Sequence, residues 1–361
     1  MVSSARSSDA VIIGAGLIGL SVARGLAAEG LNVTLIGISN PGEASPASAG
    51  MLAPSVERST GPAHDFAVAS RDRFPRFLDA LQNETGIRVP LNRLGILQVA
   101  FSPAGVKGLR KSVLPGAEWI SESDLHKLEP ALSHGLGAVF SPGDGCVDNV
   151  ELLGALAAAV NRSRISVVAG RATNVETTNS SVVVRTDAGT SFQAGTLVIA
   201  AGAWCSTISG VRFGKHVRPS KGQMLSFDAV PIRHVVYGPR GYIVPRERGH
   251  TLAGSTMEDV GFETGVTDEG VAKVRAAAVE ICEAFSGLAP AHAWAGLRPV
   301  TPDLLPMLGQ DPDDPRLVYA CGHSRNGVLL APLTAEIVTD LVVGRGVGFD
   351  LTQFRPDRFQ Y

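Results

Sequence analysis

One arginine in an apolar stretch is the first residue of this sequence that suggests chemistry. Arg298 follows Gly296-Leu297 and precedes Pro299. A charge in such surroundings is costly unless it is paired, and the planar guanidinium of arginine makes two parallel hydrogen bonds to a carboxylate. Arg298 therefore binds either a structural acidic partner or the carboxylate of a substrate. The residues alone leave both interpretations open.

Three glycines near the N-terminus have the spacing of a dinucleotide-binding turn. Gly14, Gly16 and Gly19 follow the apolar run Asp9 to Ile13 and precede a helical pattern that ends at Glu29. The first glycine permits a tight turn, the second lets the backbone approach a pyrophosphate, and the third lets the helix pack on the strand. The N-terminus of that helix would bind the phosphates. The context of strand, turn and helix predicts a bound dinucleotide.

One part of the dinucleotide motif is missing. The second predicted strand, Leu31 to Ile36, is followed by Gly37 at the position where an acidic residue usually binds the adenosine ribose. The next acidic residue is Glu43, in a predicted loop, and Ser39 or Asn40 could bond the ribose instead. This departure concerns the affinity for the cofactor more than the fold.

The pattern of predicted strands and helices indicates a mixed α/β fold. Two domains are expected because the chain has 361 residues. Strands added to the nucleotide sheet are predicted at Ile165–Val168, Ala172–Glu176, Ser181–Thr186, Thr196–Trp204 and Arg316–Cys321. Strands of another sheet are predicted at Gln223–Phe227, Gly241–Arg246 and His250–Ser255. Helices are predicted at 62–84 with an interruption at Pro75, at Val150–Val160, at Thr267–Phe285 and at Pro332–Val343. Residues 90–140 show no clear period, and the first eight residues are expected to be a disordered lead-in.

Composition excludes several classes of function. The net charge is −2 without a basic run, which argues against nucleic-acid binding. The four cysteines, Cys146, Cys205, Cys282 and Cys321, form no CxxC pair, so we expect no metal site and a reducing, cytoplasmic location. No apolar run is long enough to span a bilayer, so no membrane partner is expected.

Six segments together resemble the D-amino-acid oxidase superfamily, and most closely the glycine oxidases of thiamine biosynthesis. They are the glycine turn, Ser48–Pro54, Val198–Trp204, Gly241–Arg246, Trp294–Pro299 and Gly322–Pro332. The resemblance begins at about residue 9 and extends to the C-terminus. The last two segments, in this order and spacing, are the most specific.

The resemblance implies a noncovalent FAD and a discontinuous architecture. A Rossmann-like FAD-binding domain would comprise residues 9–88, 147–218 and 296–361, and an antiparallel-sheet substrate-binding domain residues 89–146 and 219–295. The cofactor residues implied by position are Gly14, Gly16, Leu17, Ile18, Gly19, Gly37, Ile38, Ala44, Ser45, Ala49, Gly50, Met51, Ala172, Gly322, His323, Ser324, Arg325, Asn326, Gly327, Val328 and Leu329. The helix after Gly322–Leu330 would direct its N-terminus toward the flavin and stabilise the negative charge of its reduced form.

The reaction implied by the resemblance is oxidative deamination of glycine or of another small primary or secondary amino acid, such as sarcosine or a small D-amino acid. Hydride would pass from the substrate Cα to flavin N5, and O2 would reoxidise the flavin to give H2O2. The catalytic residues implied are Arg298 and Tyr242, which bind the substrate carboxylate, and Arg325, near the substrate amine. Met51 and Met257 would line the pocket. His323 is not required as a general base if the amine arrives deprotonated.

Other functions remain open at this stage. A D-amino-acid or secondary-amine dehydrogenase would pass electrons to an acceptor other than O2, and peroxide formation separates it from an oxidase. A non-catalytic flavin-binding subunit would account for the missing acid at Gly37 but not for Arg298 and Tyr242. A dehydrogenase dependent on NAD is a weaker alternative. Arg240, before Tyr242, would narrow the pocket or favour an acidic substrate side chain. The expected partners are a small amino acid and O2, with a homo-oligomer as an open alternative.

Overall fold

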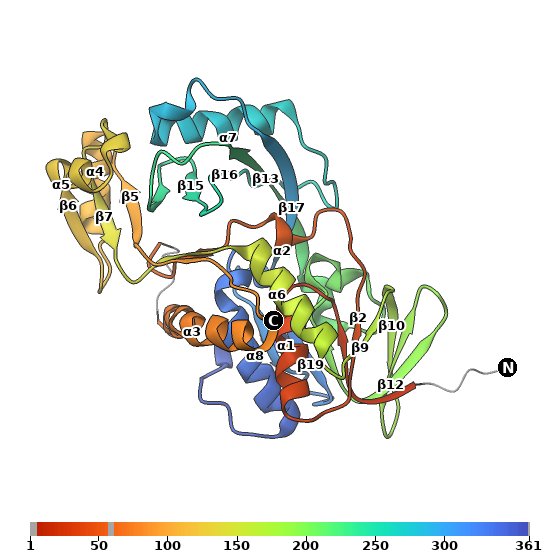
Figure 1. Cartoon of the computed structure of the whole chain (residues 1–361). Helices are drawn as coiled ribbons and strands as arrows, with labels where there is room; N and C mark the ends of the chain where they lie inside the picture. The colour runs from red at the N-terminus through yellow and green to blue at the C-terminus, as the bar shows by residue number, and fades with distance from the viewer. Residues whose placement is uncertain (1–5, 57–60, 360–361) are drawn as a thin grey trace.

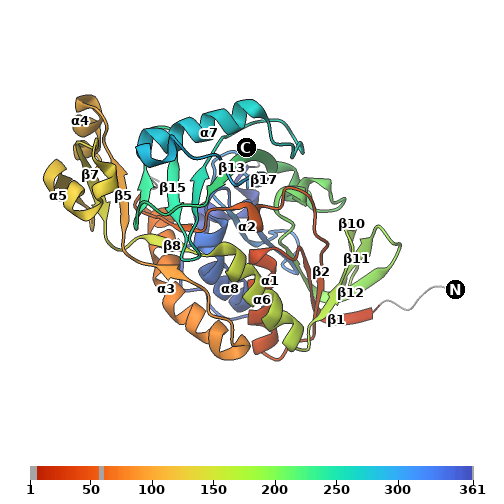
Figure 2. The same ribbon diagram turned by 45° about the horizontal axis from the view of Figure 1, so that its top comes forward.

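The computed structural model describes residues 6–56 and 61–359. Within these residues, two large sheets form the framework of the molecule, and helices pack against both (Figures 1 and 2). The predicted mixed α/β fold is confirmed.

The first large sheet contains the predicted nucleotide strands. In spatial order it comprises β10 (Ala172–Thr177), β11 (Val182–Thr186), β12 (Ser191–Ile199), β1 (Arg6–Ile13), β2 (Val33–Ile36) and β9 (Ser166–Val168), with β19 (Leu317–Cys321) paired to β12 and β18 (Met307–Gln310) paired to β19. Strand β1 is parallel to both β2 and β12. The predicted lead-in was wrong for residues 6–8, which pair with β12, while residues 1–5 lie outside the described residues.

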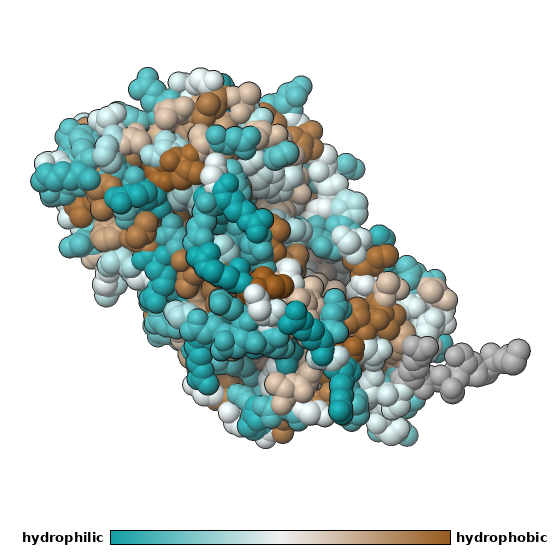
Figure 3. All heavy atoms as spheres, in the orientation of Figure 1, coloured by the Kyte–Doolittle hydropathy of each residue, from teal (hydrophilic) through white to brown (hydrophobic). Residues whose placement is uncertain are grey.

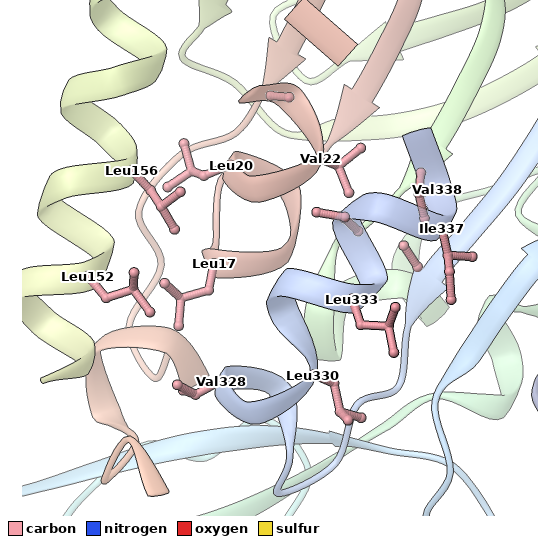
Figure 4. Close-up of a cluster of buried hydrophobic side chains, with 14 of the residues drawn as sticks. Leu17, Leu20, Val22, Leu152, Leu156, Val328, Leu330, Leu333, Ile337 and Val338 are labelled. Carbon is pink, nitrogen blue, oxygen red and sulfur yellow. The ribbon is translucent and has the colours of Figure 1, made fainter. Parts of the chain in front are cut away.

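Four helices pack on this sheet: α1 (Leu17–Ala28), α3 (Pro62–Thr85), α6 (Asn149–Arg162) and α8 (Gly327–Val343). Figure 4 shows Leu17 and Leu20 of α1 facing Leu156 of α6, while Leu333 extends from α8 on the other side of α1. Helices α1 and α8 can approach closely because Gly25 has no side chain. A Cβ on Gly25 would lie only 2.5 Å from Thr339 Oγ1. This contact holds the two helices together in their C-terminal halves.

Helix α3 continues through Pro75, so the predicted interruption was wrong. Proline removes one backbone hydrogen bond and costs about 3 kcal/mol in a helix interior. The burial of Phe66, Phe74 and Leu78 on the same helix offsets that local cost.

The second large sheet is antiparallel except at one pair. Its order is β17 (His292–Val300), β13 (Arg218–Phe227), β16 (Thr251–Gly254), β15 (Tyr242–Pro245), β14 (Val235–Tyr237), β5 (Ile96–Val99), β7 (Gly137–Ser141) and β6 (Glu118–Ser121), with β14 and β5 parallel. Helix α7 (Asp268–Ile281) covers one face. The predicted boundary between residues 295 and 296 falls inside β17.

A small lobe joins the edge of this sheet and contains two helices that the sequence pattern did not reveal. They are α4 (Pro103–Lys111) and α5 (Glu122–Leu128), at the left of Figures 1 and 2. Each helix begins after a serine whose hydroxyl accepts a backbone N–H bond: Ser102 from Gly105, and Ser121 from Asp124. These N-caps were the signal available in the sequence.

Three short strands connect the two large sheets: β3 (Met51–Leu52), β8 (Gly145–Val147) and β4 (Leu91–Asn92). Among the described residues, no helix is long and apolar enough to cross a membrane. In the view of Figure 3, hydrophobic residues are interspersed with hydrophilic ones over the surface. All four cysteines are buried and unpaired.

Candidate active site

A cavity of about 540 Å³ is lined by residues of both large sheets and their connecting loops. The first sheet contributes the glycine turn and the residues that follow β2, β9, β12 and β19. The second contributes residues from β13, β14, β15 and β17. Almost all of the predicted cofactor residues line this cavity, although they come from four separate parts of the chain.

The glycine turn has the close packing that its spacing predicted. Gly14 has a φ of +110°, and a Cβ there would overlap the carbonyl oxygen of Ala200. A Cβ on Gly19 would overlap the carbonyl oxygen of Gly14. Gly19 therefore lets the helix pack and does not itself line the cavity, whereas Gly14 and Gly16 do.

Helix α1 begins at this turn without an acidic residue in its first turn and without a side-chain cap from Gly16. The N–H of Leu17 donates to Ser45 Oγ at 3.0 Å. Leu17, Ile18 and Ser45 all line the cavity. A helix N-terminus with no negative side chain in its first turn is suited to phosphate groups.

The structure gives a steric reason for the absent acid at Gly37. Gly37 bonds β9 through its N–H, which donates to Val168 O at 3.0 Å. A Cβ on Gly37 would lie 2.6 Å from the Cβ and 2.8 Å from the backbone N of Ala15. No side chain fits there without a shift of the glycine turn, which no sequence pattern could indicate.

The loop from α2 (Ala44–Ala47) to β3 runs along the cavity, which is lined by the five residues assigned there to the cofactor: Ala44, Ser45, Ala49, Gly50 and Met51. Two residues that the sequence interpretation missed hold this loop. Asn149 Nδ2 donates to Ser45 O at 2.9 Å, and buried Arg246 donates to Ala49 O at 3.1 Å. Arg246 belongs to the Gly241–Arg246 segment, which was the available signal.

Helix α8 begins at Gly327, five residues before the predicted start at Pro332. The turn before it includes Gly322, with a φ of +70°, and Ser324, with a φ of +50°. Residues 322–328 line the cavity, including Arg325, so the first turn of α8 lies on its wall. Leu329 is buried one residue further on and does not line it.

His323 is fully enclosed within this turn. Its Nε2 lies 3.1 Å from Thr334 Oγ1, and burial lowers the pKa of the imidazole to about 3. The ring is therefore neutral at physiological pH. A group with this pKa is poorly matched to general-base catalysis near neutrality.

Arg298 lies on β17 with its guanidinium at the cavity. Nη2 donates to Ser255 Oγ at 2.7 Å, and Nη1 donates to Thr256 O at 3.2 Å. Within residues 6–56 and 61–359, Arg298 has no acidic partner within salt-bridge distance. Gly222, on the neighbouring strand β13, leaves room for the guanidinium, because a Cβ there would overlap it.

Two tyrosines face the same part of the cavity. Tyr242 donates to Met224 Sδ at 3.3 Å, and Tyr237, which the sequence interpretation missed, donates to Met51 Sδ at 3.0 Å. Their ring centroids are 5.5 Å apart. A thioether sulfur is a weak acceptor, so the Tyr242 hydroxyl can be redirected to a polar ligand.

Two sequence expectations about the pocket differ from the structure. Met257 is 59% exposed and is not among the residues that line the cavity. Arg240 lies outside the cavity, where its Nε is 2.8 Å from Glu280 Oε2 on α7. Phe262, in the loop after Met257, does line the cavity, and its ring lies 6.0 Å from that of Trp204.

The comparison with protein families agrees with this geometry. The model described as FAD dependent oxidoreductase, DAO, matches residues 9–341. The chain belongs to this FAD-dependent oxidoreductase family. The predicted superfamily is therefore confirmed, and FAD is the cofactor of the family.

Individual relatives cover nearly the whole chain. The chain is 34% identical over 98% of its length to a bifunctional protein ThiO/ThiG of Synechocystis sp., of which it spans 54%. It is 33% identical to a glycine oxidase of Geobacillus kaustophilus, with 96% of each chain covered. The crystal structure of glycine oxidase from the same organism superposes with a TM-score of 0.91 at 31% identity, covering 98% of this chain and 99% of that one. The chain thus spans about half the length of the bifunctional relatives and nearly all of the glycine oxidases.

The cavity fits the FAD of this family. The glycine turn and the start of α1 would hold the pyrophosphate, and the residues after β2 and β9, including Ile38 and Ala172, would hold the adenosine. The loop from Ala44 to Met51 and the turn at 322–328 would line the remaining length, toward Arg298. No cysteine occurs between Trp294 and Gly309, in keeping with noncovalent binding.

Proposed function

We propose that this protein is an amino-acid oxidase that acts on glycine or on another small primary or secondary amino acid. The observation that carries the proposal is the guanidinium of Arg298, which lies at the cofactor cavity and has no acidic partner among the described residues. A substrate carboxylate is the chemical group that would complete its coordination.

The residues around Arg298 support that role. Ser255 Oγ and Thr256 O hold the guanidinium plane, and Gly222 leaves it room. The Tyr242 hydroxyl would exchange its weak bond to Met224 Sδ for a stronger one to the same carboxylate. Two contacts on one carboxylate orient the substrate Cα, and bound FAD supplies the acceptor for the hydride that leaves it.

Proton handling is assigned to solvent. His323 is neutral, and the lining residues from the second sheet include no Asp, Glu or Lys in the part of the chain that the structure describes. The substrate amine would therefore lose its proton before it is oxidised. Arg325 lines the cavity and would lie near this amine.

A small substrate is favoured by the bulk around Arg298. Tyr237, Tyr242 and Met51 line the same cavity as Arg298, and the two tyrosine rings are 5.5 Å apart. The glycine oxidases among the relatives point to the same substrate class. We further propose O2 as the electron acceptor, which gives H2O2 and an imine that hydrolyses.

The absorption spectrum of the purified protein tests cofactor and reaction together. We expect flavin bands that bleach anaerobically with glycine, sarcosine or a small D-amino acid, and one H2O2 per substrate oxidised in air. Anaerobic bleaching without peroxide would replace the oxidase with a dehydrogenase. Flavin that none of these amines reduces would overturn the amine-oxidation proposal.

Arg298→Ala tests the carboxylate contact. We expect flavin reduction to require at least about a hundredfold more substrate, since a buried charged hydrogen-bond pair is lost, while FAD remains bound. Arg240→Ala removes a guanidinium outside the cavity and is the matched control. Equal substrate requirements in the two variants would contradict the role of Arg298.

A further inference from the structure

The adenosine ribose of FAD needs a hydrogen-bond acceptor that this chain does not supply at the usual place. The hydroxyls of a ribose are donors, and a carboxylate after the second strand normally accepts from them. Here that place is Gly37, and the Cβ of any other residue would lie 2.6 Å from the Ala15 Cβ. An acceptor must therefore come from another part of the chain.

The loop after Gly37 returns an acidic residue to the cavity wall. Glu43 lines the cavity together with Gly37, Ile38 and Asn40. Its Oε1 accepts from the backbone N–H of Asn40 at 2.8 Å. Glu43 has no cationic partner in residues 6–56 and 61–359, and no bond engages its second oxygen there. One carboxylate oxygen is thus fixed, and the other is available.

The loop that carries Glu43 is held firmly. The N–H of Leu297 donates to Gly42 O at 2.8 Å, which ties the loop to β17. Gly42 has a φ of +82°, and a Cβ on it would lie 2.5 Å from Thr264 Cγ2 and 3.1 Å from Leu297 Cγ. A carboxylate on such a fixed loop pays little entropy when it binds a ligand.

The other polar side chains of this loop are less suitable. Ser39 is exposed and does not line the cavity. Asn40 lines it, and its Nδ2 donates to Ile38 O at 3.0 Å, so only its neutral amide oxygen could accept. A neutral amide is a weaker acceptor than a carboxylate.

We propose that the Glu43 carboxylate binds the adenosine ribose hydroxyls of FAD and replaces the acid that Gly37 cannot carry. The proposal concerns cofactor binding and does not depend on amine oxidation. It assigns cofactor affinity to a residue six positions beyond Gly37, in a loop rather than at the strand end.

Glu43→Gln is the decisive variant. Its side-chain oxygen can still accept from the Asn40 N–H, while the second oxygen becomes an NH2 group that cannot accept from a hydroxyl. Ser39→Ala, in the same loop, is the matched control. Thermal unfolding of the apoproteins checks that both variants fold as the unsubstituted protein does.

The dissociation constant of FAD is measured by flavin fluorescence on titration of the apoprotein, with FAD and with analogues lacking the adenosine 2′- or 3′-hydroxyl. We expect Glu43→Gln to weaken FAD binding about tenfold or more, and Ser39→Ala to leave it unchanged. At least one deoxy analogue should bind the two proteins, Glu43→Gln and unsubstituted, almost equally. Unchanged FAD affinity, or the same loss for FAD and both analogues, would overturn the proposal. No amine is present, so a failure of the proposed reaction would not affect this result.

Discussion

The guanidinium of Arg246 donates a 2.7 Å hydrogen bond to the side-chain oxygen of Asn149. The same guanidinium donates to the backbone oxygens of Val147 and Ala49, and the Asn149 amide donates to Ser45 O. These bonds link the residue that follows β15, in the second sheet, to the loop that lines the cavity. They thus join the second sheet to the cavity wall.

Arg246→Met should therefore weaken both stability and cofactor binding. The substitution preserves bulk but leaves three buried oxygen acceptors without a donor, at a cost of about 3 kcal/mol or more in the free energy of unfolding. Urea unfolding and FAD titration measure the two effects. Arg248→Ala, which removes an exposed ion pair with Glu151, is the control and should cost less than about 1 kcal/mol. Equal unfolding free energies for the two variants would contradict this role.

Gly222→Ala should impair substrate binding while cofactor binding is retained. Its Cβ would overlap the Arg298 guanidinium, so the arginine must leave its position against Ser255. We expect the substrate concentration for half-maximal flavin reduction to rise by about tenfold or more. Gly154→Ala, in α6, meets no atom within 4 Å and should leave that concentration unchanged. An unaltered Gly222→Ala enzyme would mean that Arg298 is not positioned by this contact.

The pH dependence of flavin reduction should report the substrate amine and not His323. Because burial lowers the imidazole pKa to about 3, the ring is neutral at every pH above that value. We expect the second-order rate constant to rise about tenfold per pH unit below the amine pKa, without an inflection between about pH 5 and 8. Stopped-flow measurements on the unsubstituted protein and on His323→Asn should give the same slope. An inflection near neutrality that His323→Asn removes would refute this expectation.

The buried pair of Glu129 and His234 should make the small lobe sensitive to acid. Burial alone raises the pKa of the Glu129 carboxyl, but hydrogen bonds from His234 Nδ1 and from the N–H groups of Arg233 and His234 bring it below its usual value. A depressed folded-state pKa means that the stabilisation is present above the unfolded-state value, near 4.5, and is lost as the pH falls through the folded-state value.

Hydrogen exchange in β5 to β7 tests this prediction at pH 7 and below pH 4. Protection should fall in acid. In Glu129→Gln, the free energy of opening in these strands should already be about 2 kcal/mol lower at pH 7. Glu122→Gln changes an exposed carboxylate of the same lobe and serves as the control. Protection that is independent of both pH and Glu129 would rule out the pair as a stabilising contact.

The sequence predicted most of the elements that form the cavity because each has a local signal. Gly14, Gly16 and Gly19 have fixed spacing between a strand and a helix, and the apolar runs of β12 and β19 are typical of buried strands. Arg298 was recognisable because charge is rare in an apolar stretch. These are short-range properties, which a single sequence contains.

What the sequence could not indicate depends on contacts between distant segments. The collision of a side chain at Gly37 with Ala15, and the bond from Arg246 to Ala49, exist only after the chain folds. The exposure of Met257 likewise follows from the path of its loop. An acidic partner of Arg298 could have come from any distant segment, so the residues alone could not show whether the arginine was paired.

The packing of α1 against α8 has a consequence for biosynthesis. The two helices are separated by about 300 residues, which a ribosome takes roughly 15 to 60 s to add. During that interval the face of α1 that includes Gly25 has no partner, because Thr339 has not been made. This face of α1 is therefore covered only near the end of translation, and any message truncated before α8 yields a chain in which it remains uncovered.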